Sequence, residues 1–488
     1  MSAKEAKVQQ AGLTAKKEGD FVEWFNQVVL KAELADYSPV RGFMVIRPRG
    51  YALWEKIQEE FNAQIFARGV RNAYFPLLIP ESFFKKEAEH AKGFAPELAW
   101  IEKKKEEGEE GEQEERLAIR PTSETIMYDS YAKWIRSWRD LPLRINQWCN
   151  VLRWEVKQTK LFLRTREFLW QEGHCVYETA EECDKETLLF LDEYRKLVEG
   201  VLAVPVLSGK KTEKEKFAGA LYTTTLEALM PDGKALQMGT SHNLGQNFAK
   251  SFGVKFLDKG GKEQLAWQSS WGFSTRLIGA VVMLHGDDKG LVLPPKLARE
   301  KIVIVPILFD DSKQKVLKKA KEIEKELAEF NAFIDDREGY SAGWKFNEWE
   351  LKGVPLRVEL GPKDLEKKQA VLVRRDNGAK KIVKIEAVKK ESGKMLEEMQ
   401  KDLFAKAKKF LNGNIVEPKS WQEFVKAIEG KKIALAPFCH TDECENEIKE
   451  KTTATSRCIP FGQPKNFQGK CVKCGKTAKE KAYFAKAY

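Results

Sequence analysis

The order of apolar and polar residues divides the chain into three successive patterns. From residue 20 to about residue 285, strand-like apolar runs alternate with amphipathic helical segments. A second pattern begins with the apolar run KIVIVPILF, and a third begins near residue 415 with the helical segment SWQEFVKAIEG and the strand KIALAPF. Strands that alternate with helices predict α/β domains. We therefore expect domains at residues 20–290, 299–405 and 412–488.

One predicted helix begins with a charged residue. In GFSTRLIGAVVMLHGDDKG, residues 272–290, the apolar residues predict a helix buried on nearly every side, yet Arg276 lies at its start. A buried guanidinium is costly unless it meets an anion. That anion is either a core carboxylate in a structural salt bridge or a ligand phosphate, which suits the fork of donors of arginine. This segment alone does not decide between the two.

Composition narrows the class of protein. A hydrophobic content of 42% with 28 Phe in 488 residues excludes a disordered chain. No apolar run approaches the ~20 residues that span a bilayer, and the N-terminus is too charged for a signal peptide. We expect a cytoplasmic protein without a membrane partner. The net charge of +11 favours a nucleic-acid partner only modestly, because 84 basic and 73 acidic residues are interleaved.

Two segments combine charged residues with apolar strands. Thr122 and Glu124 follow a short strand in AIRPTSETIMYDSYAKWI, where Ser123 or Thr122 could instead cap the next helix. The segment QWCNVLRWEVKQTKLFLRTREFLWQEGHC is typical of a strand, a polar loop and a second strand. Arg153 and Glu155 then share one face of the first strand. Such charges predict either an inward-facing site or an exposed, salt-bridged sheet face.

Two further segments suggest binding chemistry. In LQMGTSHNLGQNFAKSFG, residues 239–242 are predicted to form a small polar turn that lets a ligand approach the backbone, although His242 could be structural. Near the C-terminus, two close cysteine pairs are separated by 26 residues, a spacing that predicts a tetrahedral Zn²⁺ site rather than buried free thiols. Cys458 could compete as a ligand. The predicted ligands are Cys439, Cys444, Cys471 and Cys474.

Together these segments resemble the class II aminoacyl-tRNA synthetases. RGVRNAYFPLLIP, with Pro76, is similar to their first, dimer-forming motif. The segment from Arg153 to Phe168 is similar to the second motif, and GFSTRLIG to the third. Within that class, FAPELAW, RPTSET, RTREFLWQEGH, KTEKEKFAG and GTSHNLGQNF resemble the prolyl-tRNA synthetase family of archaeal and eukaryotic type. The resemblance implies an α+β fold: a class II antiparallel sheet with helices, an α/β anticodon-binding domain and a C-terminal zinc-binding α/β domain.

The same resemblance implies which residues bind the substrates. The implied activity is ATP-dependent formation of prolyl-adenylate from L-proline, with Mg²⁺, and transfer of proline to tRNA(Pro) by a homodimer. Arg153, Arg276 and Glu155 are the implied catalytic residues. The implied ATP-binding residues are Arg153, Arg164, Phe168, Gln237, Thr240 and Arg276, with Arg276 at the γ-phosphate. The implied proline-binding residues are Thr122, Glu124, Arg153, Trp170, Glu172, Phe217 and His242.

The remainder of the chain adds further expectations. GWKFNEWELKGVPLRVELGPKDL resembles the anticodon-binding domain, which implies that Phe346, Glu350 and Arg357 contact the anticodon. Bacterial-type members of the resembling family carry a large editing insertion between the second and third motifs. Only about 100 residues separate these motifs here, so no such insertion is expected. The aromatic C-terminus predicts docking rather than disorder, and packing on its own domain is one alternative. The resemblance adds the other, that Tyr488 docks toward the catalytic domain and helps to order the proline pocket.

Two other functions are open on the sequence alone. A sister synthetase for another amino acid, such as threonine, would normally carry a Cys/His metal set in its active site, and none is visible in residues 118–290. A synthetase-like RNA-binding protein without catalysis should have lost Arg153, Glu155 or Arg276, and all of these are present. The acidic segment 102–116 is expected to be a solvated loop or hairpin tip.

Overall fold

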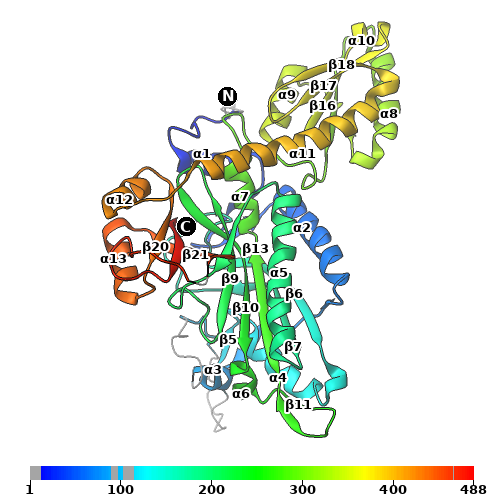
Figure 1. The fold of residues 1–488 in the computed structure, drawn as a ribbon. Helices are drawn as coiled ribbons and strands as arrows, with labels where there is room; N and C mark the ends of the chain where they lie inside the picture. Colours follow the sequence, from blue (N-terminus) through cyan, green and yellow to red (C-terminus); the bar gives the residue numbers. More distant parts are fainter. Residues whose placement is uncertain (1–11, 89–96, 103–114, 465) are drawn as a thin grey trace, which may run out of the picture.

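The computed structural model describes residues 12–88, 97–102, 115–464 and 466–488 of the chain. Two smaller bodies attach to a large central one (Figure 1). The long helix α11 (Val388–Gly413) runs from the middle domain to the C-terminal domain across one end of the central body. The predicted domain boundary between residues 405 and 412 therefore falls inside a continuous helix.

One sheet of 11 strands extends through both the central body and the C-terminal domain. Neighbouring strands are antiparallel except in the pairs β3–β6 and β19–β20, and β22 also pairs in parallel with β10. In spatial order the strands are β19 (Ile415–Val416), β20 (Ile433–Phe438), β22 (Glu480–Ala487), β21 (Thr455–Pro460), β8 (Leu207–Lys210), β9 (Tyr222–Leu229), β10 (Lys234–Gly245), β13 (Trp267–Ser274), β7 (Glu167–Tyr177), β6 (Leu143–Leu152) and β3 (Arg71–Asn72). The C-terminal domain thus extends the catalytic sheet, which the sequence patterns did not predict.

Helix α5 (Ala180–Gly200) covers one face of this sheet, packing on β9, β10 and β13. Phe190 of α5 stacks on Trp271 of β13 with ring centroids 4.2 Å apart. The apolar stripe of α5 and the sheet residues that face it account for this packing. Side chains that alternate with them along the strands point to the opposite face.

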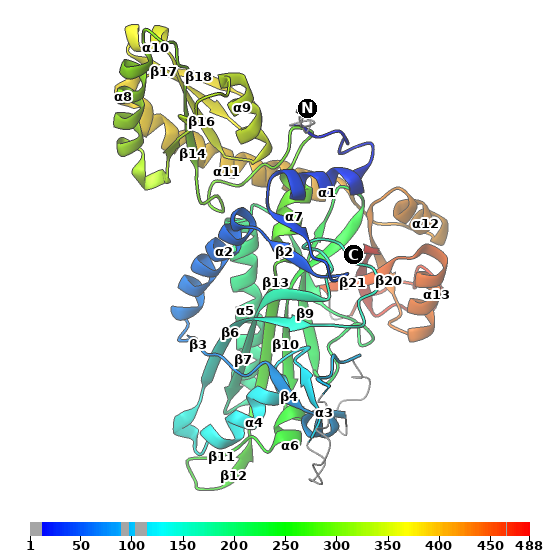
Figure 2. The ribbon, with the colours of Figure 1, turned by 180° about the vertical axis from the view of Figure 1, so that it is seen from behind.

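Other helices close the central body. Helix α7 begins at Arg276, as predicted, and ends at His285, with buried residues along most of its length. Helices α1 and α2 pack against α7 on the side seen in Figure 2. The remaining elements of this region are α1 (Phe21–Lys31), β1 (Ala35–Tyr37), β2 (Met44–Ile46), α2 (Pro48–Phe66), β4 (Leu78–Pro80), α3 (Glu81–Ala88), β5 (Leu117–Ile119), α4 (Glu124–Trp134), η1 (Trp138–Asp140), α6 (Asn247–Phe252), β11 (Lys255–Leu257) and β12 (Glu263–Leu265).

The middle domain is a five-stranded mixed sheet with helices, as the second pattern predicts. Its strands lie in the order β15 (Phe333–Ile334), β14 (Ile302–Pro306), β16 (Leu356–Leu360), β17 (Gln369–Arg374) and β18 (Lys380–Lys384). Its helices besides α11 are α8 (Lys313–Glu326), η2 (Ala328–Phe330), α9 (Ala342–Leu351), α10 (Pro362–Glu366) and η3 (Ile385–Ala387), and the C-terminal domain adds α12 (Trp421–Glu429) and α13 (Asp442–Thr452). The α+β fold with α/β second and third domains is confirmed.

Two local predictions are wrong. Residues 239–242 lie inside β10 and not in a turn, and Gly239 is needed because an added Cβ would lie 2.9 Å from Tyr194 of α5. β6 ends at Leu152, so Arg153 and Glu155 follow the strand and do not share its face.

Two further findings concern loops and membranes. Residues 103–114 of the acidic segment lie outside the described residues. Within the described part of the chain, no helix is long and apolar enough to cross a membrane.

Candidate active site

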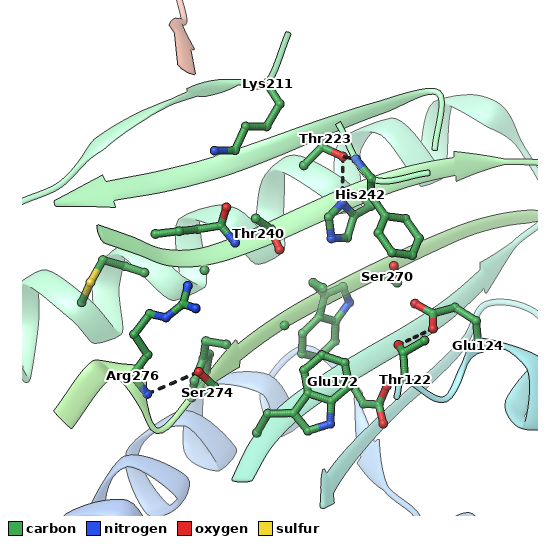
Figure 3. Close-up of a pocket in the computed structure, with 18 of the residues that line it drawn as sticks. Thr122, Glu124, Glu172, Lys211, Thr223, Thr240, His242, Ser270, Ser274 and Arg276 are labelled. Carbon is green, nitrogen blue, oxygen red and sulfur yellow. Dashed lines mark hydrogen bonds between the residues drawn. The ribbon is translucent and has the colours of Figure 1, made fainter. Parts of the chain in front are cut away.

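A cavity of about 260 Å³ lies on the face of the catalytic sheet opposite α5 (Figure 3). Glu172 of β7 points into this cavity, whereas the neighbouring Gln171 accepts a hydrogen bond from Tyr194 of α5. The polar residues that line the cavity are Thr122, Glu124, Arg153, Glu172, His174, Lys211, Glu215, Thr223, Gln237, Thr240, His242, Ser270, Ser274 and Arg276, and the aromatic ones include Phe168, Trp170 and Phe217.

Strand geometry explains how distant residues share the cavity. Alternate residues of β7, from Phe168 through Trp170 and Glu172 to His174, face the same way. In β10, a register shift against β9 lies between Gln237 and Gly239, so Gln237 pairs with Glu227 and Thr240 with Thr225. The bulge keeps Gln237 and Thr240 on the cavity face although three positions separate them.

One end of the cavity holds two buried carboxylates. Glu124 is 4% exposed and accepts a hydrogen bond from the Thr122 hydroxyl. Glu172 is 2% exposed and accepts from the Ser123 hydroxyl (2.5 Å), the Ser123 amide (3.2 Å) and Gln147 (3.0 Å). Ser123 therefore precedes α4 without a side-chain capping bond, because its hydroxyl binds Glu172 instead. The capping alternative is wrong for Ser123.

Two histidines at this end have opposite pKa shifts. His174 lies 3.1 Å from Glu172, and although burial opposes its charged form, Glu172 and Glu124 raise the pKa of His174. Burial also opposes ionisation of Glu172, but the hydrogen bond and charge of His174 hold its pKa below the usual value. Burial, with the positive charges of His174 and Lys211, lowers the pKa of His242 to about 3. His242 is therefore neutral near pH 7, and its Nδ1 pairs with the Thr223 hydroxyl at 2.8 Å.

Glu124, Glu172 and His174 place one ligand atom each within 4.8 Å of one another, a spacing compatible with a metal ion. Each carboxylate already accepts a hydrogen bond, and His174 is hydrogen-bonded to both Glu172 and the Tyr128 hydroxyl. With His174 protonated, the cluster carries a net charge of one negative unit. That charge suits a single organic ammonium.

The other end of the cavity is cationic. Arg276 donates from Nε to the Leu163 carbonyl at 3.2 Å, and Arg153 donates from Nε to the Pro121 carbonyl at 3.4 Å. Among the residues that the structure describes, neither guanidinium has a carboxylate at ion-pair distance. Burial and the charge of Arg153 lower the pKa of Arg276 to about 10, so it stays charged at neutral pH. The structural salt bridge considered for Arg276 is absent from the described part of the chain.

Two predicted residues, the catalytic Glu155 and the ATP-binding Arg164, do not line this cavity. Glu155 and Arg164 are exposed in the segment between β6 and β7, although their charges act on Arg153 and Arg276 respectively. The other predicted substrate-binding residues come together in the cavity. Sequence reasoning missed several lining residues, including His174, Lys211 and Thr223. The alternation of side chains along a strand, applied from Glu172, would also have found His174.

The predicted anticodon residues form a separate cluster in the middle domain. The Arg357 guanidinium lies 4.1 Å from the centroid of the Phe346 ring and 3.1 Å from Glu350, and it also pairs with Glu359 at 2.9 Å. Phe346 and Glu350 lie on α9, whereas Arg357 lies on β16. A helix and a strand thus present an aromatic face, a carboxylate and a guanidinium together.

The C-terminal domain brings its predicted zinc ligands together. The Sγ atoms of Cys439, Cys444, Cys471 and Cys474 all lie within 4.8 Å of one another, and those of Cys439 and Cys474 are 3.8 Å apart. Tetrahedral thiolates at ~2.3 Å from zinc would be separated by about 3.8 Å. The four thiols therefore fit a structural Zn²⁺. Cys458, buried in β21, is not part of this group.

The C-terminal residue docks on the catalytic domain, as predicted. The Tyr488 hydroxyl donates to Asp232 at 2.7 Å, and β22 pairs with β10 beside it. Tyr488 is not among the residues that line the cavity.

Comparison with known proteins agrees with this architecture. Family models match residues 105–285 (tRNA synthetase class II core domain, G, H, P, S and T), 301–394 (anticodon binding domain) and 421–488 (prolyl-tRNA synthetase, C-terminal).

Relatives match almost the whole chain. A proline–tRNA ligase of Cenarchaeum symbiosum is 50% identical over 98% of this chain and 100% of its own length. Others from Alkaliphilus oremlandii and Rubrobacter xylanophilus are 50% and 52% identical, covering 96% and 97% of this chain and 97% and 98% of their own lengths. The chain belongs to the proline–tRNA ligase family of class II aminoacyl-tRNA synthetases.

Proposed function

We propose that the protein activates L-proline with ATP to form prolyl-adenylate and transfers the prolyl group to tRNA(Pro). The observation that carries the proposal is the division of one cavity between buried carboxylates and unpaired arginines. Adenylate formation requires a carboxylate to attack the α-phosphorus of ATP, so two anions must be held together. Fixed cations offset their repulsion.

We assign ATP to the cationic end. At the cationic end, Arg153 is the arginine on which Glu124 and Glu172 act, and it also acts on Arg276. Its guanidinium would bridge the α-phosphate and the carboxylate of proline, while Arg276 binds the γ-phosphate. Phe168 offers a ring face to adenine, and Gln237 and Thr240 offer hydrogen bonds from β10. Mg²⁺ would enter bound to the phosphates.

Arg164 and Glu155 do not line the cavity in this structure. Their roles toward the phosphates and adenine therefore require the segment between β6 and β7 to close over ATP. Both side chains interact electrostatically with the cationic end. Arg164 adds to the lowering of the pKa of Arg276 by burial. Glu155 opposes the lowering of the pKa of Arg153 by burial.

We assign proline to the acidic end. The secondary ammonium would pair with Glu124, with Thr122 and Glu172 holding the carboxylate geometry. The ring would pack among Trp170, Phe217 and His242; the last two rings lie 4.8 Å apart. Neutral His242 adds no charge that would repel the ammonium. Threonine or histidine would leave polar groups unpaired against these rings.

Smaller amino acids are harder to reject. Missing methylenes change binding by only ~1–3 kcal/mol, so we expect misactivation of alanine or cysteine. Between β7 and β13 the chain forms α5 and further strands of the catalytic sheet, which supports the absence of an editing domain in cis. Prompt hydrolysis of Ala-tRNA by the pure protein would refute that absence.

The remaining assignments concern macromolecular partners. Phe346, Glu350 and Arg357 are proposed to contact the anticodon by stacking and hydrogen bonding. Since Arg357 already pairs with Glu350 and Glu359, it must exchange a partner to reach a base. We further expect a homodimer, which molar mass in solution would test.

Amino-acid-dependent exchange of pyrophosphate into ATP tests the proposed reaction. Proline should support the fastest exchange among the natural amino acids. Faster exchange with threonine or histidine would show that the protein activates an amino acid other than proline. Absence of exchange with every amino acid would favour a non-catalytic RNA-binding role.

A further inference from the structure

The cavity segment around Lys211 is held by the C-terminal domain. Lys211 follows β8, and β8 pairs with β21 of the C-terminal domain, where Lys210 faces Ile459. Lys211 is 8% exposed and lines the cavity. The position of Lys211 in the cavity therefore depends on the pairing of β8 with β21, which lies more than 200 residues further along the chain.

A single carboxylate joins Lys211 to that domain. Glu227 of β9 is 1% exposed and accepts from Lys211 Nζ at 2.7 Å through one oxygen. Its other oxygen accepts from Nε and Nη2 of Arg457 at 3.0 and 2.7 Å. Arg457 is contributed by β21 and also donates to the Thr455 hydroxyl at 3.0 Å. Each oxygen of Glu227 thus serves a different cation.

The charges of Lys211, Glu227 and Arg457 do not cancel. Lys211 and Arg457 share the carboxylate of Glu227, which leaves one net positive charge within these three residues. Glu215, which lines the cavity, is a further carboxylate that acts on Arg457. Figure 3 shows Lys211 and Arg276 at the end of the cavity away from Thr122 and Glu124. The excess charge therefore adds to that of Arg276, where an anion is to be bound.

We propose that Arg457 is a positioning residue for ATP, which acts through Glu227 to hold the Lys211 ammonium in the cationic end of the cavity. The inference rests on the proposed function, because it takes ATP as the anion at that end. Arg457 itself does not line the cavity and is not assigned a contact with substrate. The C-terminal domain thereby contributes to the ATP site as well as to stability.

A second connection joins the same segment to the same domain. The Thr212 hydroxyl lies 3.0 Å from Glu445 of α13 and 3.2 Å from the Ser456 hydroxyl of β21. Thr212 is 3% exposed, so these bonds are shielded from water. Because Thr212 follows Lys211, they fix the backbone from which the lysine extends.

Substrate-specific kinetics of exchange test this role. Arg457→Met removes one charge and should raise KM for ATP roughly tenfold or more, the scale of a lost charge-assisted hydrogen bond, while KM for proline changes less than twofold. Arg457→Lys keeps the charge and should restore most of the ATP affinity. Lys481→Met removes a cation of the same domain whose one ion pair among the described residues is with Glu417 (2.6 Å). It is the matched control and should leave both constants unchanged.

A double-mutant cycle separates positioning from general damage. If Arg457 acts through Lys211, Arg457→Met should have little further effect on KM for ATP in the Lys211→Met background. Should Arg457→Met fail to fold, Thr212→Val provides the test, with a rise in KM for ATP of about fivefold. Equal rises for ATP and proline, additive effects in the cycle, or normal kinetics in folded Arg457→Met would each overturn the proposal.

Different results would contradict the proposed function and the positioning role of Arg457. If the unmutated protein exchanges pyrophosphate with another amino acid or with none, the assignment of proline activation is wrong. ATP binding measured by calorimetry then replaces KM in the same set of variants. Unchanged ATP affinity in Arg457→Met would overturn the positioning role in that case as well.

Discussion

The two ends of the cavity differ in how far their charged side chains are paired with partners in the protein. At the acidic end, Glu172 is surrounded by donors from Ser123 and Gln147 and lies beside a histidine whose pKa is raised. At the cationic end, Arg153 and Arg276 make side-chain hydrogen bonds only to carbonyl oxygens within the described part of the chain. One end is thus largely neutralised by the protein, whereas the other depends on a ligand.

This difference suggests how the site divides its task. The acidic end needs only enough residual charge to select one ammonium, so its carboxylates are fixed by neighbours. The cationic end must offset several phosphate charges, and pairing its arginines with carboxylates would cancel that capacity. Their half-buried charge costs stability in the empty protein and becomes favourable when the anion binds.

Removing a cation should have the largest effect. Arg276→Ala is expected to reduce proline-dependent pyrophosphate exchange by at least ~10²-fold, because it deletes a preorganised donor to the phosphates. The proposed dimerisation and tRNA binding should stay largely intact. The control is Arg195→Ala, which removes a surface arginine already paired with Asp192 at 2.5 Å. Equal exchange by Arg276→Ala and the unmutated protein would return Arg276 to a structural role.

A change at the acidic end should affect the other substrate. Glu124→Gln keeps an acceptor for the Thr122 hydroxyl but removes the charge, so KM for proline should rise about 10- to 100-fold. KM for ATP should change little. Glu263→Gln, at an exposed carboxylate paired with Lys255, is the control. A rise confined to KM for ATP would contradict the assignment of the two ends.

Parts of this site follow from the sequence through local rules. The start of α7 at Arg276 comes from apolar periodicity, and β7 corresponds to the second strand predicted after the polar loop. The zinc ligands follow from cysteine spacing. These features depend on residues close together in the chain.

Other parts depend on contacts that no local rule encodes. The polar run at residues 239–242 indicated a turn, yet it lies in a strand whose glycine accommodates Tyr194 of α5. The bond between Ser123 and Glu172 and the joint pairing of Glu227 with Lys211 and Arg457 connect distant elements. The continuation of the catalytic sheet into the C-terminal domain is of the same kind.

Zinc removal should lower the stability of the protein without directly affecting substrate binding at either end of the cavity. We expect about one zinc per chain, and Cys471→Ser should lower Tm by several degrees because a closed thiolate site stabilises its fold. KM for ATP should rise no more than in Arg457→Met, since zinc acts on the cavity only through the domain. Protein purified without chelators and lacking metal would contradict the site.

The neutral histidine at the acidic end should make stability depend on pH. Unfolded His242 binds a proton near pH 6.5, whereas the folded residue does so only near pH 3, so the unfolded state binds more protons between these values. Stability should therefore fall as pH decreases below about 6.5. The free energy of unfolding, measured by urea titration, should fall between pH 7 and pH 5 by about 2 kcal/mol more in the unmutated protein than in His242→Gln. If the change between pH 7 and pH 5 is the same in both proteins, His242 takes up its proton in the folded state as readily as in the unfolded state.

The smallest effect is expected at the C-terminus. Deleting Tyr488 removes its bond to Asp232 and its contact beside β10, but no residue that lines the cavity. KM for proline should rise by less than about fivefold, with zinc content and folding unchanged. Unchanged exchange kinetics would leave Tyr488 as a packing residue only.

The most direct test of the division is a crystal structure with proline and a non-hydrolysable ATP analogue bound together. We predict that the proline nitrogen lies within hydrogen-bonding distance of Glu124, that Arg153 contacts both the proline carboxylate and the α-phosphate, and that Arg276 contacts the γ-phosphate. A γ-phosphate bound away from Arg276, or a proline nitrogen away from Glu124 and Glu172, would contradict the assignment of the two ends.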